Sequence, residues 1–72
     1  MYMTVEEKIK TLMSRQKMSM GEMAEKTSQS RQNLSNKMKR SDFSEKEIEK
    51  MANALGYTSE VIFRDTDGNI VL

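Results

Sequence analysis

The chain has 72 residues, a formal net charge of +1 and no cysteine or histidine. This length predicts a single small domain, near the lower limit for an independent hydrophobic core. Without cysteine the chain forms no disulfide and no thiolate metal site, so its stability must come from compact helix packing, helix caps or a partner chain. Because the apolar runs are short, we expect no membrane partner and a cytoplasmic location.

The charges are distributed unevenly along the chain. Residues 1–29 carry five bases and four acids, and residues 41–72 carry three bases and seven acids. Residues 30–40, with the sequence SRQNLSNKMKR, carry four bases and no acid. The net charge alone predicts no polyanionic partner, but its distribution concentrates positive charge on this one segment.

Apolar residues at helical spacing predict four helices, at about 4–16, 20–26, 30–39 and 45–55. Three of these helices begin with a capping box, in which a hydroxyl accepts a hydrogen bond from the third helical N–H and a glutamate accepts one from the cap N–H. The pairs are Thr4 with Glu7, Ser19 with Glu22, and Ser44 with Glu47.

The remaining helix boundaries are marked by serine and glycine. The stretch TSQS interrupts the helical pattern, since these side chains favour local bonds to the backbone. Ser28 or Ser30 is the expected N-cap of the third helix. Gly56 occupies the position at which a glycine commonly ends a helix.

The chain contains eight methionines, which admit two interpretations. A methionine-rich surface is typical of a promiscuous peptide groove, whereas buried methionines fill irregular gaps in a core. Four of them lie on the predicted inward stripes, namely Met13, Met23, Met38 and Met51. The core interpretation is therefore favoured.

The C-terminal segment changes character. β-Branched and aromatic residues flank the dipeptide Asp67-Gly68, which predicts a β-hairpin with strands near 60–65 and 69–72. A lone two-stranded hairpin is marginal in water. The hairpin must therefore pack on the helices or pair with another chain, and we favour pairing with another chain slightly.

The second and third predicted helices, separated by a short break, form a candidate helix-turn-helix unit. In such a unit the later helix enters the major groove of DNA and needs an apolar inner stripe and a donor-rich outer face. Leu34 and Met38 supply the inner stripe, and Gln32, Asn36 and Lys39 lie within about 60° of one another on the opposite side. A solvated surface helix has the same residue types, but the charge segregation and the helix spacing favour DNA.

Arginine pairs with guanine, and glutamine or asparagine pairs with adenine, so three residues are predicted to read bases: Arg31, Gln32 and Asn36. Six further residues are predicted to contact phosphates: Ser19, Ser30, Asn33, Lys37, Lys39 and Arg40. The acids near residues 42–49 have no histidine or cysteine beside them. We expect no enzyme activity, no cofactor and no metal site.

The stretch SMGEMAEKTSQSRQNLSNKMK resembles the helix-turn-helix of the Cro/repressor-type, or Xre-like, family. The positions that carry the resemblance are Ser19, Met23, Ala24, Ser28 and Leu34, together with the later ANALG. The resemblance implies a mainly α fold with a four-helix DNA-binding domain at 1–57. The hairpin expected at 58–72 belongs to the same structural unit and is a candidate dimerisation element. The resemblance also implies a regulator that binds two-fold symmetric operators as a homodimer, from a phage-like or bacterial source.

The chain departs from the family pattern at two positions. Met20 stands where many relatives place a glutamine or threonine that touches the DNA backbone. Ser28 replaces the usual turn glycine, at a position that often needs a positive φ.

Two functions therefore compete. The first is sequence-specific binding of double-stranded DNA, with transcriptional regulation as the outcome. The alternative is a protein-interaction module, antitoxin-like or an adaptor, that uses the acidic C-terminal half and the edge of the hairpin.

Overall fold

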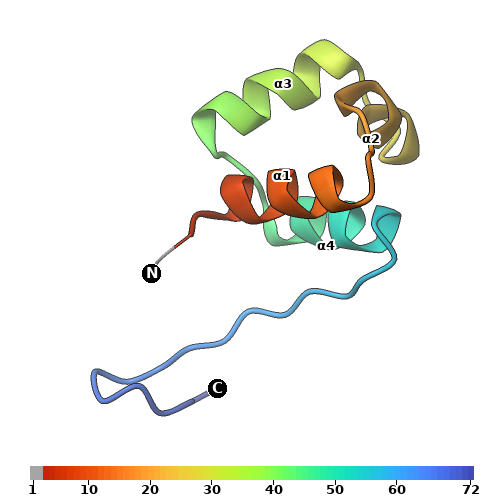
Figure 1. Ribbon diagram of the computed structural model, residues 1–72. Helices are drawn as coiled ribbons and strands as arrows, with labels where there is room; N and C mark the ends of the chain where they lie inside the picture. Colours follow the sequence, from red (N-terminus) through yellow and green to blue (C-terminus); the bar gives the residue numbers. More distant parts are fainter. Residues whose placement is uncertain (1–2) are drawn as a thin grey trace.

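The computed structural model describes residues 3–72, and these form four helices and an extended C-terminal tail (Figure 1). The helices are α1 (Val5–Arg15), α2 (Met20–Lys26), α3 (Arg31–Arg40) and α4 (Glu45–Ala54). α2 packs against α3, and α4 packs against both α1 and α2. The mainly helical class and all four predicted helices are confirmed, with boundaries that differ by at most one residue.

Each described helix begins at a predicted N-cap, and for α3 the structure selects one of the two candidates. The capping boxes of α1, α2 and α4 are all formed, with Thr4, Ser19 and Ser44 as caps. In α3 the cap is Ser30, whose hydroxyl oxygen accepts a hydrogen bond of 3.0 Å from the backbone N–H of Asn33. These caps satisfy backbone groups that the helix itself leaves without partners, so each helix begins at a defined residue.

All four helices also end in the same way. A left-handed residue follows each helix, directly after α3 and one residue later after α1, α2 and α4. The φ values are 55° at Lys17, 56° at Ser28, 52° at Ser41 and 85° at Gly56. The next N–H then reaches back to a carbonyl in the last turn, as in the bond of 3.0 Å from Gln29 to Ala24. A helix end closed by these two backbone hydrogen bonds, such as Ser28 to Glu25 and Gln29 to Ala24, is a Schellman motif. Gly56 fills its position without strain, whereas the other three carry side chains in a conformation that favours glycine.

The turn between α2 and α3 has additional side-chain support. Thr27 is buried, and its hydroxyl donates to the carbonyl oxygen of Met23 at 2.8 Å. The same hydroxyl accepts a hydrogen bond of 2.7 Å from the side-chain amide of Gln29. The positive φ expected at Ser28 is present, so the turn keeps its shape although serine replaces glycine.

Replacement of Ser28 by glycine is expected to raise the free energy of unfolding by about 0.5–1 kcal/mol. The left-handed conformation disfavours an L-residue by about 1–2 kcal/mol, and the greater flexibility of unfolded glycine offsets about half of that gain. The matched control is Ser35→Gly in the middle of α3, which should lower the free energy of unfolding by about 0.5 kcal/mol. Urea unfolding followed by circular dichroism measures both, and a destabilised Ser28→Gly chain would contradict this account of the turn.

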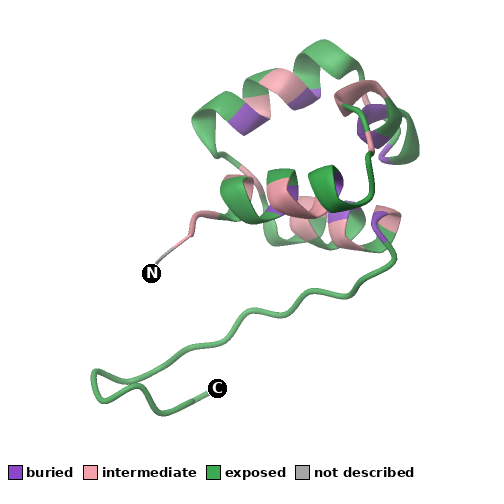
Figure 2. Cartoon of the chain, in the orientation of Figure 1, coloured by how far each residue is buried: buried purple, intermediate pink, exposed green. Residues whose placement is uncertain are grey.

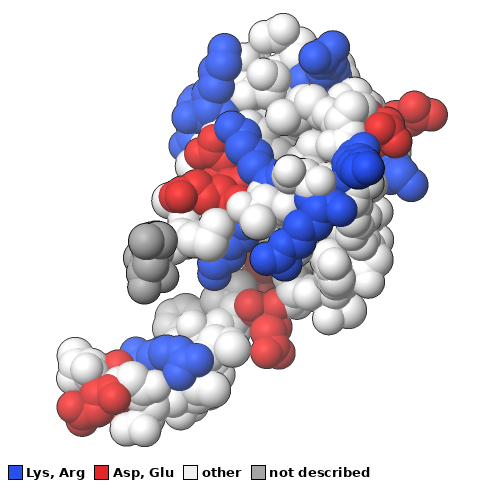
Figure 3. All heavy atoms as spheres, viewed as in Figure 1, with Lys and Arg blue, Asp and Glu red and all other residues white. Residues whose placement is uncertain are grey.

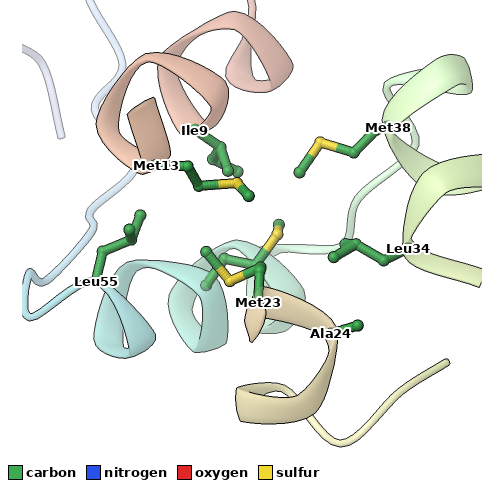
Figure 4. Packing of buried hydrophobic residues seen from close by; sticks show 8 residues of the cluster. Ile9, Met13, Met23, Ala24, Leu34, Met38 and Leu55 are labelled. Carbon is green, nitrogen blue, oxygen red and sulfur yellow. The ribbon is translucent and has the colours of Figure 1, made fainter. Parts of the chain in front are cut away.

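The core lies between the four helices (Figure 2). Figure 4 shows the side chains of Met13, Met23 and Met38 pointing toward one another from three different helices. The buried apolar residues are Ile9, Met13, Met23, Ala24, Leu34, Met38, Met51 and Leu55. All four methionines predicted to lie inward are buried, which confirms the core interpretation.

The predicted β-hairpin is wrong. Neither 60–65 nor 69–72 forms a strand, and the structure shows one isolated antiparallel bridge between Arg64 and Ile70. The tail, residues 57–72, extends away from the helices and is exposed throughout (Figures 1 and 2). Its first residues, 57–61, line one hollow together with Ile9 of α1 and Leu55 at the C-cap of α4, and the rest of the tail leaves the helical core uncovered (Figure 1).

The turn predicted around Asp67-Gly68 is formed. Asp65 accepts two backbone N–H bonds through its carboxylate, from Asp67 and Asn69, and Gly68 has a φ of 88°. Beyond the bridge, Phe63 bonds to both Val71 and Leu72, which is the pattern of a β-bulge and interrupts regular pairing. A two-stranded unit with nothing packed on it lacks the burial that stabilises longer pairing.

Candidate nucleic-acid interface

The outer face of α3 presents the predicted base-reading side chains to solvent. Arg31, Gln32 and Asn36 are exposed, while Leu34 on the opposite side is fully buried. Because Leu34 and Met38 anchor the helix in the core, the polar face has a fixed orientation. The helix thus offers an exposed surface of hydrogen-bonding groups on an element anchored in the core.

Gln32 and Asn36 lie one turn apart and interact directly. The amide nitrogen of Gln32 donates to the side-chain oxygen of Asn36 at 3.2 Å. This bond occupies one donor hydrogen, and it leaves the oxygen of Gln32, its second hydrogen and the NH₂ group of Asn36 available. The pair therefore holds two amides side by side without consuming the groups needed to recognise a base.

The N-terminus of α3 differs from the other three helix starts. Among the described helices, α1, α2 and α4 each have an acidic residue in the first turn, and α3 has none. Asn33 is held there by a bond of 3.1 Å from its side-chain amide to the oxygen of Gln29. Partial positive charge at a helix N-terminus attracts anions, so this end favours a phosphate more than the others do.

Ser19 at the start of α2 is less favourably placed for the predicted phosphate contact. Its hydroxyl oxygen accepts from the N–H of Glu22 at 3.1 Å, and its own N–H donates to the carboxylate of Glu22 at 3.1 Å. The carboxylate already occupies the position an anion would take. A phosphate contact by Ser19 would have to displace it.

Lys37 behaves differently from the other predicted phosphate contacts. Its ammonium group forms an ion pair with the carboxylate of Glu47 on α4, whereas Lys39 and Arg40 are exposed. On a helical projection Lys37 lies about 60° from Leu34, so it flanks the buried stripe and faces α4. The positive charge assigned to this residue is thus compensated within the chain.

The ion pair also affects the carboxyl group. The hydrogen bond from Lys37 holds the pKa of Glu47 below its ordinary value of 4.5. A lowered folded-state pKa means that the ionised form stabilises the fold above the unfolded-state value, and that this stabilisation is lost as the pH falls through the folded-state value.

Replacement of Glu47 by glutamine is expected to flatten the pH dependence of stability in the acid range. Glutamine at this position keeps the capping box but not the ion pair. The free energy of unfolding of the original chain should fall as the pH drops below 4.5, by a small amount because the pair is partly solvated. Denaturant unfolding from neutral to acid pH measures the difference, with exposed Glu49→Gln as the control. Equal acid sensitivity in Glu47→Gln and the original chain would contradict a role for this pair.

Two further bases lie beside the turn between α2 and α3. A hollow next to this turn is lined by Lys26 of α2 and Lys50 of α4, together with Ser28 of the turn itself. No sequence pattern links these two lysines, because they are far apart in the chain and the packing of α2 on α4 brings them to one hollow. Figure 3 shows Lys and Arg groups at both sides of the upper edge of the molecule, where α3 lies, with uncharged atoms between them.

Comparisons of the chain with family models, with curated proteins and with solved structures found no match. Within residues 3–72, no helix is long and apolar enough to cross a membrane. The functional assignment therefore depends on the residues of this chain and on their arrangement.

Proposed function

We propose that this protein binds double-stranded DNA in a sequence-specific manner and acts as a transcriptional regulator. The observation that carries the proposal is the outer face of α3, where exposed arginine and amide side chains project from a helix anchored in the core. Residues 26–41 contain no acid, so no carboxylate from the turn or from α3 itself repels a phosphate.

In the proposed complex, α2, the turn and α3 act as a helix-turn-helix. α3 enters the major groove, and Arg31, Gln32 and Asn36 contact base edges. Lys39 and Arg40 at the other end of α3 contact flanking phosphates, which set the position and orientation of the helix. Ser30 and Asn33 assist at the N-terminus of α3, where the partial charges attract a phosphate. Such a role also agrees with the expected cytoplasmic location.

The proposal includes a homodimer. A single small module buries little DNA surface, and two modules on symmetric half-sites about double the contact area. The two half-sites would then lie one helical turn apart, or a multiple of it, along the duplex.

The affinity for duplex DNA is expected to fall steeply with salt. A dimer that makes roughly six to ten phosphate contacts loses about 10³–10⁵ in affinity between about 50 and 200 mM salt, because each contact releases counterions. Fluorescence anisotropy with a labelled duplex measures this slope. Lys39→Ala should reduce the slope more than Lys37→Ala, because the charge of Lys37 is already paired with Glu47. Binding that does not change with salt would contradict the proposal.

The second candidate function is a protein-interaction module. The exposed apolar side chains of the tail favour it, since Phe63 is 63% exposed and Leu72 is 86% exposed. The double variant Arg31→Ala, Gln32→Ala separates the two functions. Under the DNA proposal it loses DNA binding and keeps its fold, whereas under the alternative it retains whatever binding the protein has.

A further inference from the structure

The tail exposes one edge of its backbone. In an antiparallel ladder, alternate residues direct their N–H and C=O groups to opposite edges. Phe63 and Asp65 bond inward, to residues 69–72. In the part of the chain that the structure describes, the backbone N–H and C=O groups of residues 58–62 and of Arg64 have no hydrogen-bond partner. Within this segment, Glu60, Ile62 and Arg64 are the residues that alternate with the inward-bonded Phe63 and Asp65. These three residues therefore form a free edge.

The sequence along this free edge is complementary to itself. When a second copy of the segment EVIFR is laid antiparallel with Ile62 opposite Ile62, Glu60 falls opposite Arg64 at both ends. Val61 falls opposite Phe63 on the other face. A shift by one residue would place Glu60 opposite Phe63 and would lose both ion pairs, so the charges define a single register.

We propose that residues 60–64 of two copies pair as an antiparallel, two-fold symmetric β-ribbon centred on Ile62, and that this ribbon is the dimer interface. The paired edge is the one that the tail leaves free. Glu60, Ile62 and Arg64 form the hydrogen-bonded pairs across the axis, which matches the direction of their unpaired backbone groups. Opposite charges and aromatic–β-branched pairs both stabilise cross-strand neighbours.

The exposed apolar side chains of the tail are consistent with pairing to a second copy of the chain. Val61 is 55% exposed, Ile62 is 41% exposed and Phe63 is 63% exposed. In the ribbon, two Val61–Phe63 pairs lie together on one face, and the two copies of Ile62 meet on the other. A two-fold axis requires one surface to be complementary to itself, and the segment EVIFR meets that requirement in both charge and apolarity. An unrelated partner would not need this symmetry.

The described helices form no hydrogen bonds with the backbone groups of this free edge. The hydrogen bonds that residues 58–72 make within the described chain are all internal to the tail. An exposed edge of this kind is a template for pairing with another chain. The inference does not depend on DNA binding, because the pairing involves residues that lie outside α2 and α3.

Charge reversal tests the interface by sedimentation equilibrium of the full chain without DNA. The original chain should form dimers. Glu60→Arg and Arg64→Glu should each weaken the dimer by at least about tenfold, because each replaces two attractive pairs with two repulsive ones. The double variant Glu60→Arg, Arg64→Glu should restore the dimer, although it also lacks the bond from Arg64 to the carbonyl of Gly68. Asp67→Arg, at the turn, is the matched control and should have little effect.

Single-cysteine variants test the register, since the described chain contains no cysteine. Ile62→Cys should be crosslinked between copies by a short bifunctional thiol reagent, because hydrogen-bonded partners have Cα atoms about 5.5 Å apart. Ser59→Cys should not, because its two copies would lie about 20 Å apart. A monomeric original chain, a dimer unaffected by either charge reversal, or equal crosslinking at both positions would overturn the proposal. Circular dichroism of every variant verifies that the helices remain folded.

Discussion

Replacement of both Arg31 and Gln32 by alanine is expected to lower specific affinity for DNA by at least about 10²-fold. Each bidentate contact to a base contributes about 1–3 kcal/mol of discrimination, and the variant removes two such contacts from each half-site. Both side chains are exposed, so the substitutions should change the free energy of unfolding by less than about 0.5 kcal/mol. Anisotropy titrations with specific and unrelated duplexes measure the loss.

The matched control for this variant is Lys10→Ala. Lys10 is an exposed base on α1 that pairs with Glu6 at 2.8 Å, so its removal changes net charge without touching α3. The control should retain both affinity and sequence preference. If the double variant still preferred the specific duplex as strongly as the original chain does, α3 would not be the reading element.

Replacement of Leu34 by alanine is expected to lower the free energy of unfolding by about 2–5 kcal/mol. Leu34 is fully buried, and it anchors α3 against the methionine cluster. A domain of this size has a total stability of roughly 4–11 kcal/mol, so the variant should lose a large part of it. The midpoint of urea unfolding, followed by circular dichroism, measures the change.

Leu72→Ala makes the same chemical change in the exposed tail and is the control for Leu34→Ala. Leu72 is 86% exposed, so its truncation should alter the unfolding midpoint very little. Because Leu34 holds the polar face of α3 in position, the core variant should also lose DNA binding at temperatures where it is partly unfolded. Equal effects of the two substitutions would contradict the packing described for α3.

The helices were predictable from sequence because their signals are local. A capping box spans four residues, and an apolar stripe repeats within one helix, so both can be identified without knowing the fold. The inward positions of Met23 and Met38 followed from the same periodicity. The left-handed conformation at Ser28 was expected only through the resemblance to a family that places glycine there.

Features that depend on contacts between elements were not predictable. The pairing of Lys37 with Glu47 joins α3 to α4, and the sequence of α3 alone gave Lys37 the same expected role as Lys39. The convergence of Lys26 and Lys50 on one hollow likewise depends on how α2 packs against α4. The residue types of the candidate site could therefore be predicted from sequence. Which of its basic side chains are already paired with an acid could be predicted only in part.

The tail shows how a correct local signal leads to a wrong element. The Asp-Gly turn and the β-branched residues are present, and the turn forms with one bridge. Regular strands need a partner to bury their apolar side chains, and those of Val61, Phe63 and Ile70 remain at least half exposed in this chain. The proposed pairing of two copies would supply this missing burial.

Selection of binding sites from randomised duplex DNA tests the central claim most directly. We expect the recovered duplexes to share a motif with two halves related by a two-fold axis, and the Arg31→Ala, Gln32→Ala variant to fail to enrich it. Recovery of duplexes without any common motif, or enrichment of the same motif by the variant, would contradict the assignment of α3 as the helix that reads DNA.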